Sequence, residues 1–246
     1  MNALKSESTY QLFSRHYEAL TYDLPYDLWL DIINHFKGGR QSVLDIGCGT
    51  GRLTSQLDFD KVTGMDQSPQ MIEEAKSKNL KQTSFLTGDM LDFRLDEKFD
   101  MAIATVDVMN YCKDPSEVAQ VLKNVYDHLN PDGIFLFDIH SVYKMEHEFN
   151  DMTYSDETDH ITYIWHAITG EHPLSVIHDM TFFVKEEDGD TYRKIAETHE
   201  QRTYKHKEMI RVINQTDFSI LNSFSDFSID NPVTDICDRV FYVLKK

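Results

Sequence analysis

The sequence predicts an α/β fold with a doubly wound, mostly parallel sheet, and the first reason is an alternation of short apolar runs with helical patterns. The strand-like runs cover residues 42–47, 61–66, 83–89, 99–105 and 133–139. Residues 68–79 and 115–129 lie between them and have the periodicity of helices. Nearly all-apolar strands that alternate with helices are typical of a parallel sheet covered on both faces.

The second reason is that both predicted helices have clear ends. Ser68 and Asp114 precede them, and each side chain can accept a hydrogen bond from the free amides of a first helical turn. Residues 130–133, Asn-Pro-Asp-Gly, are expected to stop the second helix and to turn the chain into the next strand.

The segments on either side of this core have a different pattern. Residues 7–37 are expected to be helical, in two pieces separated at Pro25. After residue 140, stretches rich in β-branched and aromatic residues predict antiparallel hairpins over residues 161–168, 175–186 and 190–204. A helix over 205–216 and strands over 218–227 and 238–245 complete the expected elements.

The pattern divides the chain into three parts. Residues 1–140 hold the N-terminal helices and the α/β core, and residues 207–246 add the final helix and the last two strands of its sheet. Residues 141–206 form an antiparallel β insertion, with 14 acidic and 6 basic residues. Ligands of open α/β sheets bind beyond the carboxyl ends of the strands, so the insertion is expected to be a lid there, or else the face of a homodimer.

Composition narrows the classes of partner. The chain has 24 basic and 42 acidic residues, a net charge of −18, which argues against a nucleic-acid substrate because the phosphate backbone would be repelled. With no run of 18 apolar residues and no signal-peptide pattern at the N-terminus, no membrane span is predicted. Three widely spaced cysteines favour neither a disulfide framework nor a zinc site, so the expected location is the cytoplasm.

Histidines are concentrated in one region. Eight of the 11 fall between residues 140 and 206, without the helical i,i+4 spacing or the compact clustering typical of metal ligands. No metal site is predicted.

The stretch SVLDIGCGTG, residues 42–51, has the form of a buried strand that runs into a glycine-rich turn. Dinucleotide-binding turns have the spacing G-x-G-x-x-G, whereas Gly47, Gly49 and Gly51 have the spacing G-x-G-x-G. Asp45 precedes them, and a carboxylate there is poorly placed beside a pyrophosphate but well placed near a cation. The combination fits S-adenosylmethionine, which carries an ammonium and a sulfonium group and no phosphate.

With this motif the chain resembles the class I, Rossmann-like S-adenosylmethionine-dependent methyltransferases, whose first motif reads (V/L)-L-(D/E)-x-G-x-G-x-G. The resemblance covers residues 40–140 by motif and the last two strands by order. It implies a seven-stranded sheet with an antiparallel last strand. The chain also resembles a subgroup of small bacterial methyltransferases of unassigned substrate, which begin F-x-x-x-Y-(D/E) and then P-Y-x-x-W; the matching residues are Phe13, Tyr17, Glu18, Pro25, Tyr26 and Trp29.

Further positions are expected to bind the cofactor. Asp66 ends the second strand, 19 residues after Gly47, where its two oxygens can accept hydrogen bonds from both ribose hydroxyls. The resemblance implies that Asp89 contacts the adenine amino group, with Met90 beside the ring; the alternative for Asp89 is a surface loop acid. It also implies that Tyr17 and Tyr26 approach the methionine end of the cofactor. The alternative is that these aromatics only anchor a helix to the sheet.

In the family, cofactor and substrate meet after the fourth strand. Candidate catalytic residues are therefore Asp107, which would also contact the cofactor, Tyr111, and His140 at the end of the fifth strand. Candidate substrate-binding residues are Asn110, Tyr111, Tyr143, Trp165, His166 and Arg202. Each of three candidates has an alternative role in the fold alone. Asn110 would be a helix cap, Tyr111 a core residue, and Trp165 part of the core of its sheet or of a dimer face. The proline pair of enzymes that methylate DNA bases is missing after the fourth strand, which further disfavours such a substrate.

The resulting prediction is a methyltransferase that moves a methyl group from S-adenosylmethionine to a small-molecule acceptor by in-line displacement, leaving S-adenosylhomocysteine. A general base is needed only if the acceptor's nucleophile arrives protonated. The alternatives are an NAD-dependent oxidoreductase on a similar fold and a non-catalytic cofactor-binding module.

Overall fold

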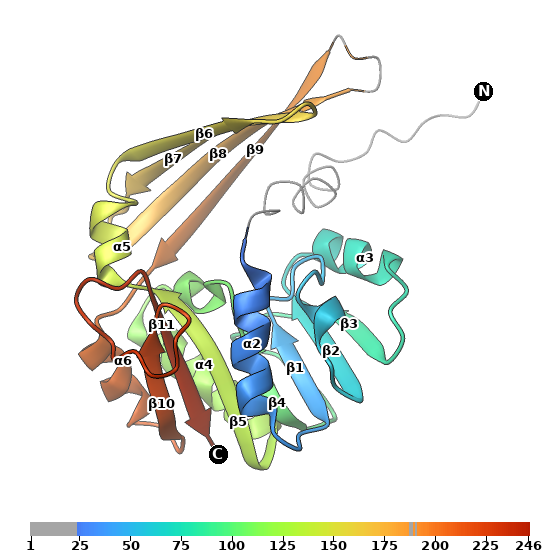
Figure 1. Cartoon of the computed structure of the whole chain (residues 1–246), viewed down its shortest axis with the longest axis vertical. Coiled ribbons are helices and arrows are strands. Elements are labelled where there is room, and N and C mark those ends of the chain that lie inside the picture. The colour runs from blue at the N-terminus through green and yellow to red at the C-terminus, as the bar shows by residue number, and fades with distance from the viewer. Residues whose placement is uncertain (1–23, 187–188, 190) are drawn as a thin grey trace.

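The computed structural model describes residues 24–186, 189 and 191–246, and its centre is a seven-stranded sheet (Figure 1). The order of the strands is β10-β11-β5-β4-β1-β2-β3. Only β11 runs antiparallel to its neighbours, as expected from the sequence. The bounds are β1 (Ser42–Ile46), β2 (Lys61–Asp66), β3 (Thr83–Thr87), β4 (Phe99–Ala104), β5 (Leu129–His140), β10 (Ser219–Ser225) and β11 (Arg239–Lys245).

Helices cover both faces of this sheet, because alternate strand residues point to opposite sides. On one face, Val43 and Ile103 pack with Trp29 of α2. On the other face, Leu44 packs with residues of α4 and α6. The helices are α2 (Tyr26–Lys37), α3 (Pro69–Ser77), α4 (Pro115–His128), α5 (Val142–His147) and α6 (His206–Ile213), with short 3-10 turns η1 (Thr54–Gln56) and η2 (Val108–Tyr111).

The predicted helix starts are confirmed at the level of hydrogen bonds. The Ser68 hydroxyl accepts from the amide of Met71, and the Asp114 carboxylate accepts from the amides of Ser116 and Glu117. Proline occupies the first turn of both helices, where its missing N–H costs nothing.

Strand β5 begins four residues earlier than the sequence predicts. Residues 130–133 do not form a separate turn but a bulge, since β4 residues Phe99 and Met101 pair with Leu129 and Ile134. The extra residues leave the ladder, and Asp132 takes a left-handed φ of 61° there.

A second, antiparallel sheet has the order β6-β7-β8-β9. Its strands are β6 (Met152–Glu157), β7 (Ile161–Thr169), β8 (Ser175–Lys185) and β9 (Tyr192–Arg202). The last three match the predicted hairpins. The sequence did not predict β6 or α5, because MTYSDE is polar and short and α5 has only six residues.

The second sheet lies above the carboxyl ends of the parallel strands (Figure 1). The end of β9 reaches the core directly, where Asn110 Nδ2 donates to the Arg202 carbonyl at 3.0 Å. Thr203 donates its hydroxyl to the carbonyl of His140 at the end of β5. Within the described residues, no helix is long and apolar enough to cross a membrane.

Candidate active site

The glycine turn after β1 needs glycine at each of its three positions. Gly47, Gly49 and Gly51 have φ values of 71°, 55° and 75°, which side chains strongly disfavour. A Cβ on Gly47 would also lie 2.3 Å from Cγ2 of Val108, and one on Gly51 would lie 2.8 Å from the ring of Phe85. The turn therefore keeps its backbone bare and tightly packed against the loop that follows β4.

Two carboxylates lie beside this turn. Asp66 Oδ2 accepts from the Gly49 amide at 2.8 Å, and its Oδ1 accepts from the Ser68 amide at 2.9 Å. Asp45 is buried and accepts from the Thr54 hydroxyl at 2.6 Å. Burial raises the pKa of Asp66, and burial together with the charge of Asp66 raises the pKa of Asp45 to about 7. A cationic ligand would relieve both penalties, so the pair fits the charges of S-adenosylmethionine.

The raised pKa of Asp45 gives a prediction for stability. Between pH 4 and 7 the unfolded chain ionises this carboxyl while the folded protein keeps its proton, so the group's contribution to stability falls as the pH rises. The variant Asp45→Asn keeps an acceptor for Thr54 but does not titrate. Relative to the wild type, its free energy of unfolding should rise by about 1–3 kcal/mol between pH 5 and pH 8.

Urea unfolding of both proteins across this pH range measures the difference. Equal pH dependence in the two proteins would show that Asp45 ionises normally in the folded state.

The other predicted cofactor residues have the following positions. Tyr26 begins α2, and the guanidinium of Arg52, which follows the glycine turn, lies 4.8 Å from the centre of its ring. Asp89 accepts from the Leu91 amide at 2.8 Å after β3, and the Met90 carbonyl accepts from Asn124 at 3.1 Å. Tyr17 lies outside the described residues.

The loop after β4 has an unusual backbone. Val106 and Asp107 both lie in the left-handed region, with φ values of 60° and 58°, which is costly for a β-branched residue such as valine. Asp138 of β5 compensates, because its carboxylate accepts from both of their amides, at 2.9 and 3.1 Å. Its Oδ1 also accepts from the indole N–H of Trp29 at 3.0 Å.

Arg239, the first residue of β11, neutralises this buried carboxylate. Its guanidinium pairs with Asp138, lies 3.4 Å from Oδ1 of Asp107 and stacks over the ring of Trp29 at 5.0 Å. Arg239 is not among the residues predicted from the sequence. The signal for it is its place at the start of an otherwise apolar strand, where an unpaired cation would be destabilising.

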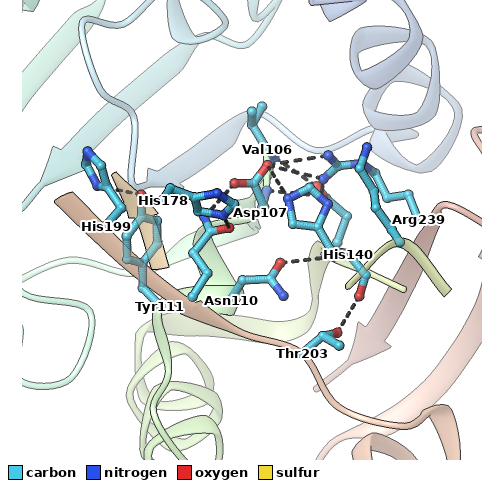
Figure 2. Close-up of polar contacts among 12 residues, drawn as sticks. Val106, Asp107, Asn110, Tyr111, His140, His178, His199, Thr203 and Arg239 are labelled. Carbon is cyan, nitrogen blue, oxygen red and sulfur yellow. Dashed lines mark hydrogen bonds and ion pairs between the residues drawn. The ribbon is translucent and has the colours of Figure 1, made fainter. Parts of the chain in front are cut away.

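Asp107 is the centre of the site (Figure 2). Gln201 of β9 donates to its Oδ2 at 2.8 Å, and Nε2 of His140 lies 3.6 Å from its Oδ1. Burial opposes ionisation of this carboxyl, but His140, Arg239 and Gln201 together hold its pKa well below the usual range. Asp107 is therefore a carboxylate at neutral pH.

His140 is held by hydrogen bonds at its backbone, while one nitrogen of its buried ring has no such bond. Its amide donates to Oδ1 of Asn110 at 3.0 Å, and its carbonyl accepts from Thr203. Its side chain is buried, and within the described part of the chain Nδ1 has no hydrogen-bond partner. Burial lowers the pKa of His140 in spite of the neighbouring Asp107, so the ring is neutral near pH 7.

Two more histidines complete the group shown in Figure 2. Burial lowers the pKa of His178 to about 4, and it lowers the pKa of His199 as well. The Tyr111 hydroxyl lies 3.0 Å from Nδ1 of His199, and Tyr111 is 41% exposed. The structure thus places Tyr111 at an open edge of the site rather than in the core.

The structure brings only some of the predicted substrate-binding residues to this site. Trp165 points to the core side of the second sheet, where its indole N–H donates to His178 at 3.0 Å. His166, the next residue of β7, points to the opposite face and bonds Thr153. Arg202 donates to the carbonyl of Lys113 at 2.8 Å, and so ties β9 to the core instead of facing Asp107.

The remaining two candidates differ in position. Tyr143 lies on α5, where its ring stacks on His147 at 4.4 Å. Both ends of the Asn110 amide are used by backbone groups of His140 and Arg202, so Asn110 supports the site and does not present a free polar group. Among the residues that the structure describes, no group of three His, Cys, Asp or Glu side chains could hold a metal ion.

Comparisons with known proteins agree with this geometry. Residues 43–133 match the family model described as a methyltransferase domain. The chain is 34% identical over 248 residues to a protein named as a methyltransferase in Geobacillus sp. (strain WCH70), covering 97% of this chain and 100% of that protein.

Solved structures show the same fold. An S-adenosylmethionine-dependent methyltransferase from Clostridium acetobutylicum ATCC 824 matches with a TM-score of 0.84 and 27% identity, over 96% of this chain and 98% of that chain. An amino pentose methyltransferase from Micromonospora echinaspora, solved with bound S-adenosylmethionine, matches with a TM-score of 0.73 and 17% identity, over 93% and 95% of the two chains. Together with the glycine turn and its carboxylates, these matches show that the chain belongs to the class I S-adenosylmethionine-dependent methyltransferases.

Proposed function

We propose that this methyltransferase acts on a small-molecule acceptor by in-line displacement and that His140 is its general base. The observation that carries the proposal is the Asp107–His140 pair at the carboxyl edge of the sheet, below the second sheet. Bound S-adenosylmethionine supplies an electrophilic methyl carbon and a thioether leaving group. The protein's own tasks are to align the acceptor, to exclude water and to remove a proton.

The groups beside the glycine turn are suited to hold the cofactor. Asp45 and Asp66 offer buried carboxylates to a cationic and hydroxylated ligand, and the bare glycine backbone permits close approach. Asp89 and Met90 follow β3, next along the same edge of the sheet, and Tyr26 lies beside the glycine turn.

His140 has the properties of a base. Because Asp107 is ionised, it can only accept a hydrogen bond, so the His140 nitrogen that faces it, Nε2, is the one that carries the ring proton. Nδ1 of the neutral ring then has a lone pair to offer, and among the described residues this atom has no hydrogen-bond partner. After taking up a proton, the imidazolium would be stabilised by the adjacent carboxylate.

The charges around His140 favour an amine as the acceptor. Arg239 pairs with two carboxyl groups, those of Asp107 and Asp138, and Lys144, which also acts on His140, pairs with Glu148 at 3.6 Å. Acidic groups therefore outnumber basic ones around the ring, and burial lowers the pKa of each of the three histidines. An ammonium group is attracted to this site and needs a base to release its lone pair, whereas an anionic acceptor is repelled. The amino pentose methyltransferase of similar fold is likewise named for an amine-bearing sugar.

Acceptor-contacting side chains are proposed on both sides of the base. Tyr111 is exposed at the edge of η2, and the Trp165 ring lies on the core-facing side of the second sheet. Tyr143 on α5 is a third candidate. A direct contact from His166 would require that ring to reach around its strand, so His166 is not included, and Arg202 acts through Lys113.

The function is tested by incubating the protein with methyl-labelled S-adenosylmethionine and a panel of small amines, alcohols and carboxylic acids, and by identifying labelled products by mass. Transfer to amines supports the proposal. Transfer to carboxylic acids alone would contradict the amine acceptor, and cofactor binding without any labelled product would favour a non-catalytic module.

The variant Asp66→Ala should weaken binding of S-adenosylhomocysteine by about 1.5–3 kcal/mol, the range for hydrogen bonds to a charged group. Isothermal titration calorimetry measures the change. Its matched control is Asp92→Ala, which removes an exposed carboxylate paired with Arg94 and should leave the affinity unchanged. An unaltered affinity of Asp66→Ala would remove that residue from the cofactor site.

A cytoplasmic location and a homodimer through the second sheet are further predictions from the sequence. The oxidoreductase alternative is tested by titration with NAD, for which we expect no binding because the turn has the wrong glycine spacing.

A further inference from the structure

A line of hydrogen bonds crosses from the second sheet to Asp107. The Trp165 indole N–H donates to Nδ1 of His178 at 3.0 Å, and Nε2 of His178 lies 3.2 Å from Oε1 of Gln201. Gln201 Nε2 then donates to Oδ2 of Asp107 at 2.8 Å. Both His178 and Gln201 are buried, at 6% and 4% exposure, so these bonds do not compete with bulk water.

The direction of every bond in this line is fixed by chemistry. An indole N–H can only donate, so Nδ1 of His178 must offer a lone pair, and the ring proton is on Nε2. Nε2 therefore donates to the oxygen of the Gln201 amide, which leaves the amide nitrogen to face Asp107. The carboxylate at the end of the line can only accept, so no member can be reversed without losing a bond.

Protonation of His178 would disrupt the line at its start. A proton on Nδ1 would face the indole N–H of Trp165, and two donors cannot bond each other. The neutral ring expected from this geometry agrees with the lowered pKa of His178. The charged or titratable groups that act on this ring are His140, Asp107 and His199.

The line also divides the two oxygens of Asp107 between different partners. Oδ2 accepts from Gln201, whereas Oδ1 faces Nε2 of His140 and the guanidinium of Arg239. A carboxylate that is pinned at Oδ2 cannot rotate away from His140. The His140 ring is then held with its proton toward Asp107 and its lone pair on Nδ1.

We propose that His178 and Gln201 are positioning residues for methyl transfer, which hold Asp107 so that His140 keeps Nδ1 unprotonated. This inference rests on the proposed role of His140 as the base. It gives the second sheet a task beyond covering the site, because Trp165, His178 and Gln201 lie on its strands β7, β8 and β9.

The decisive variant is Gln201→Met, which keeps the length of the side chain and removes both hydrogen bonds. In the full-length protein labelled with nitrogen-15 histidine, long-range proton–nitrogen NMR reports which ring nitrogen of His140 carries the proton. We expect a single tautomer with the proton on Nε2 in the wild type and a mixture in Gln201→Met. The kcat of the variant should fall roughly 10- to 100-fold, as for a lost hydrogen bond to a charged group.

The control variant is Glu200→Gln on the opposite, exposed face of β9, which should leave both readouts unchanged. Trp165→Phe keeps an aromatic ring but removes the donor to Nδ1 of His178. Because the Gln201 oxygen still accepts from Nε2, His178 and His140 should both keep their tautomers in this variant. Binding of S-adenosylhomocysteine should stay within about twofold in every variant, since none of these residues lies at the glycine turn.

An unchanged His140 tautomer in Gln201→Met, or a proton on Nδ1 of His178 in the wild type, would overturn the inference. Failure of the proposed function looks different. If the wild type binds S-adenosylhomocysteine but methylates no amine, the proposed acceptor is wrong, while the NMR tautomers still decide whether Gln201 positions the Asp107–His140 pair.

Discussion

Replacing Arg239 with leucine is expected to lower the free energy of unfolding by about 3–5 kcal/mol, because the carboxylate of Asp138 is left charged in a buried site. Among the residues that the structure describes, Arg239 is the cation that pairs with Asp138. The remaining bonds of Asp138 come from the indole and from the amides of Val106 and Asp107, which do not cancel a full charge. The measurement is equilibrium unfolding in urea, followed by circular dichroism.

Two variants make this result interpretable. Arg94→Leu removes an exposed guanidinium, 3.7 Å from Asp92, and should cost less than about 1 kcal/mol. Arg239→Lys keeps the charge and should recover part of the loss, although a lysine cannot bridge Asp138 and Asp107 with the same planar group. A loss in Arg239→Leu as small as that in Arg94→Leu would mean that Asp138 is neutral in the folded protein.

The variant His140→Gln should reduce kcat by about 10²- to 10⁴-fold, the usual contribution of a positioned general base. Glutamine keeps the backbone bonds to Asn110 and Thr203 but has no group that takes up a proton near neutral pH. The affinity for S-adenosylhomocysteine should change by less than about threefold, because His140 contacts Asp107 and not the glycine turn.

Steady-state rates with the best amine acceptor, together with calorimetric titration of S-adenosylhomocysteine, give the two quantities separately. The matched control is His160→Gln, which changes an exposed histidine between β6 and β7 and should retain the full rate. A kcat of His140→Gln close to that of the wild type would show that another group, or water, removes the proton.

Much of the fold could be predicted because its signals are local. Apolar runs defined β1 to β4, and the caps at Ser68 and Asp114 defined where α3 and α4 begin. The glycine turn could also be recognised from the sequence, since the spacing of its glycines and the preceding Asp45 are features of one short stretch of chain. The seven strands and the antiparallel last strand followed from the family resemblance and were confirmed.

The rest of the site could not be predicted because it depends on contacts between distant segments. Gln201 meets Asp107 across 94 positions of sequence, and Arg239 meets Asp138 across 101. The apolar strand that begins at Arg239 indicates that this cation needs a partner but not which one, and Gln201 has no local signal of this kind. Likewise, His166 and Trp165 are neighbours in the chain, and only the pairing of β7 decides which of them faces the core.

The way β9 joins the core has a consequence for engineering new acceptor preferences. An insertion of this kind could be exchanged between related proteins if it made no specific contacts with the core. Here it does make them: Gln201 bonds Asp107, the Arg202 carbonyl bonds Asn110, and Thr203 bonds His140. If the donor sequence supplies the same three contacts, the C-terminal junction of a chimaera can lie after residue 203. If it does not, the junction must lie before residue 201, so that Gln201, Arg202 and Thr203 are retained.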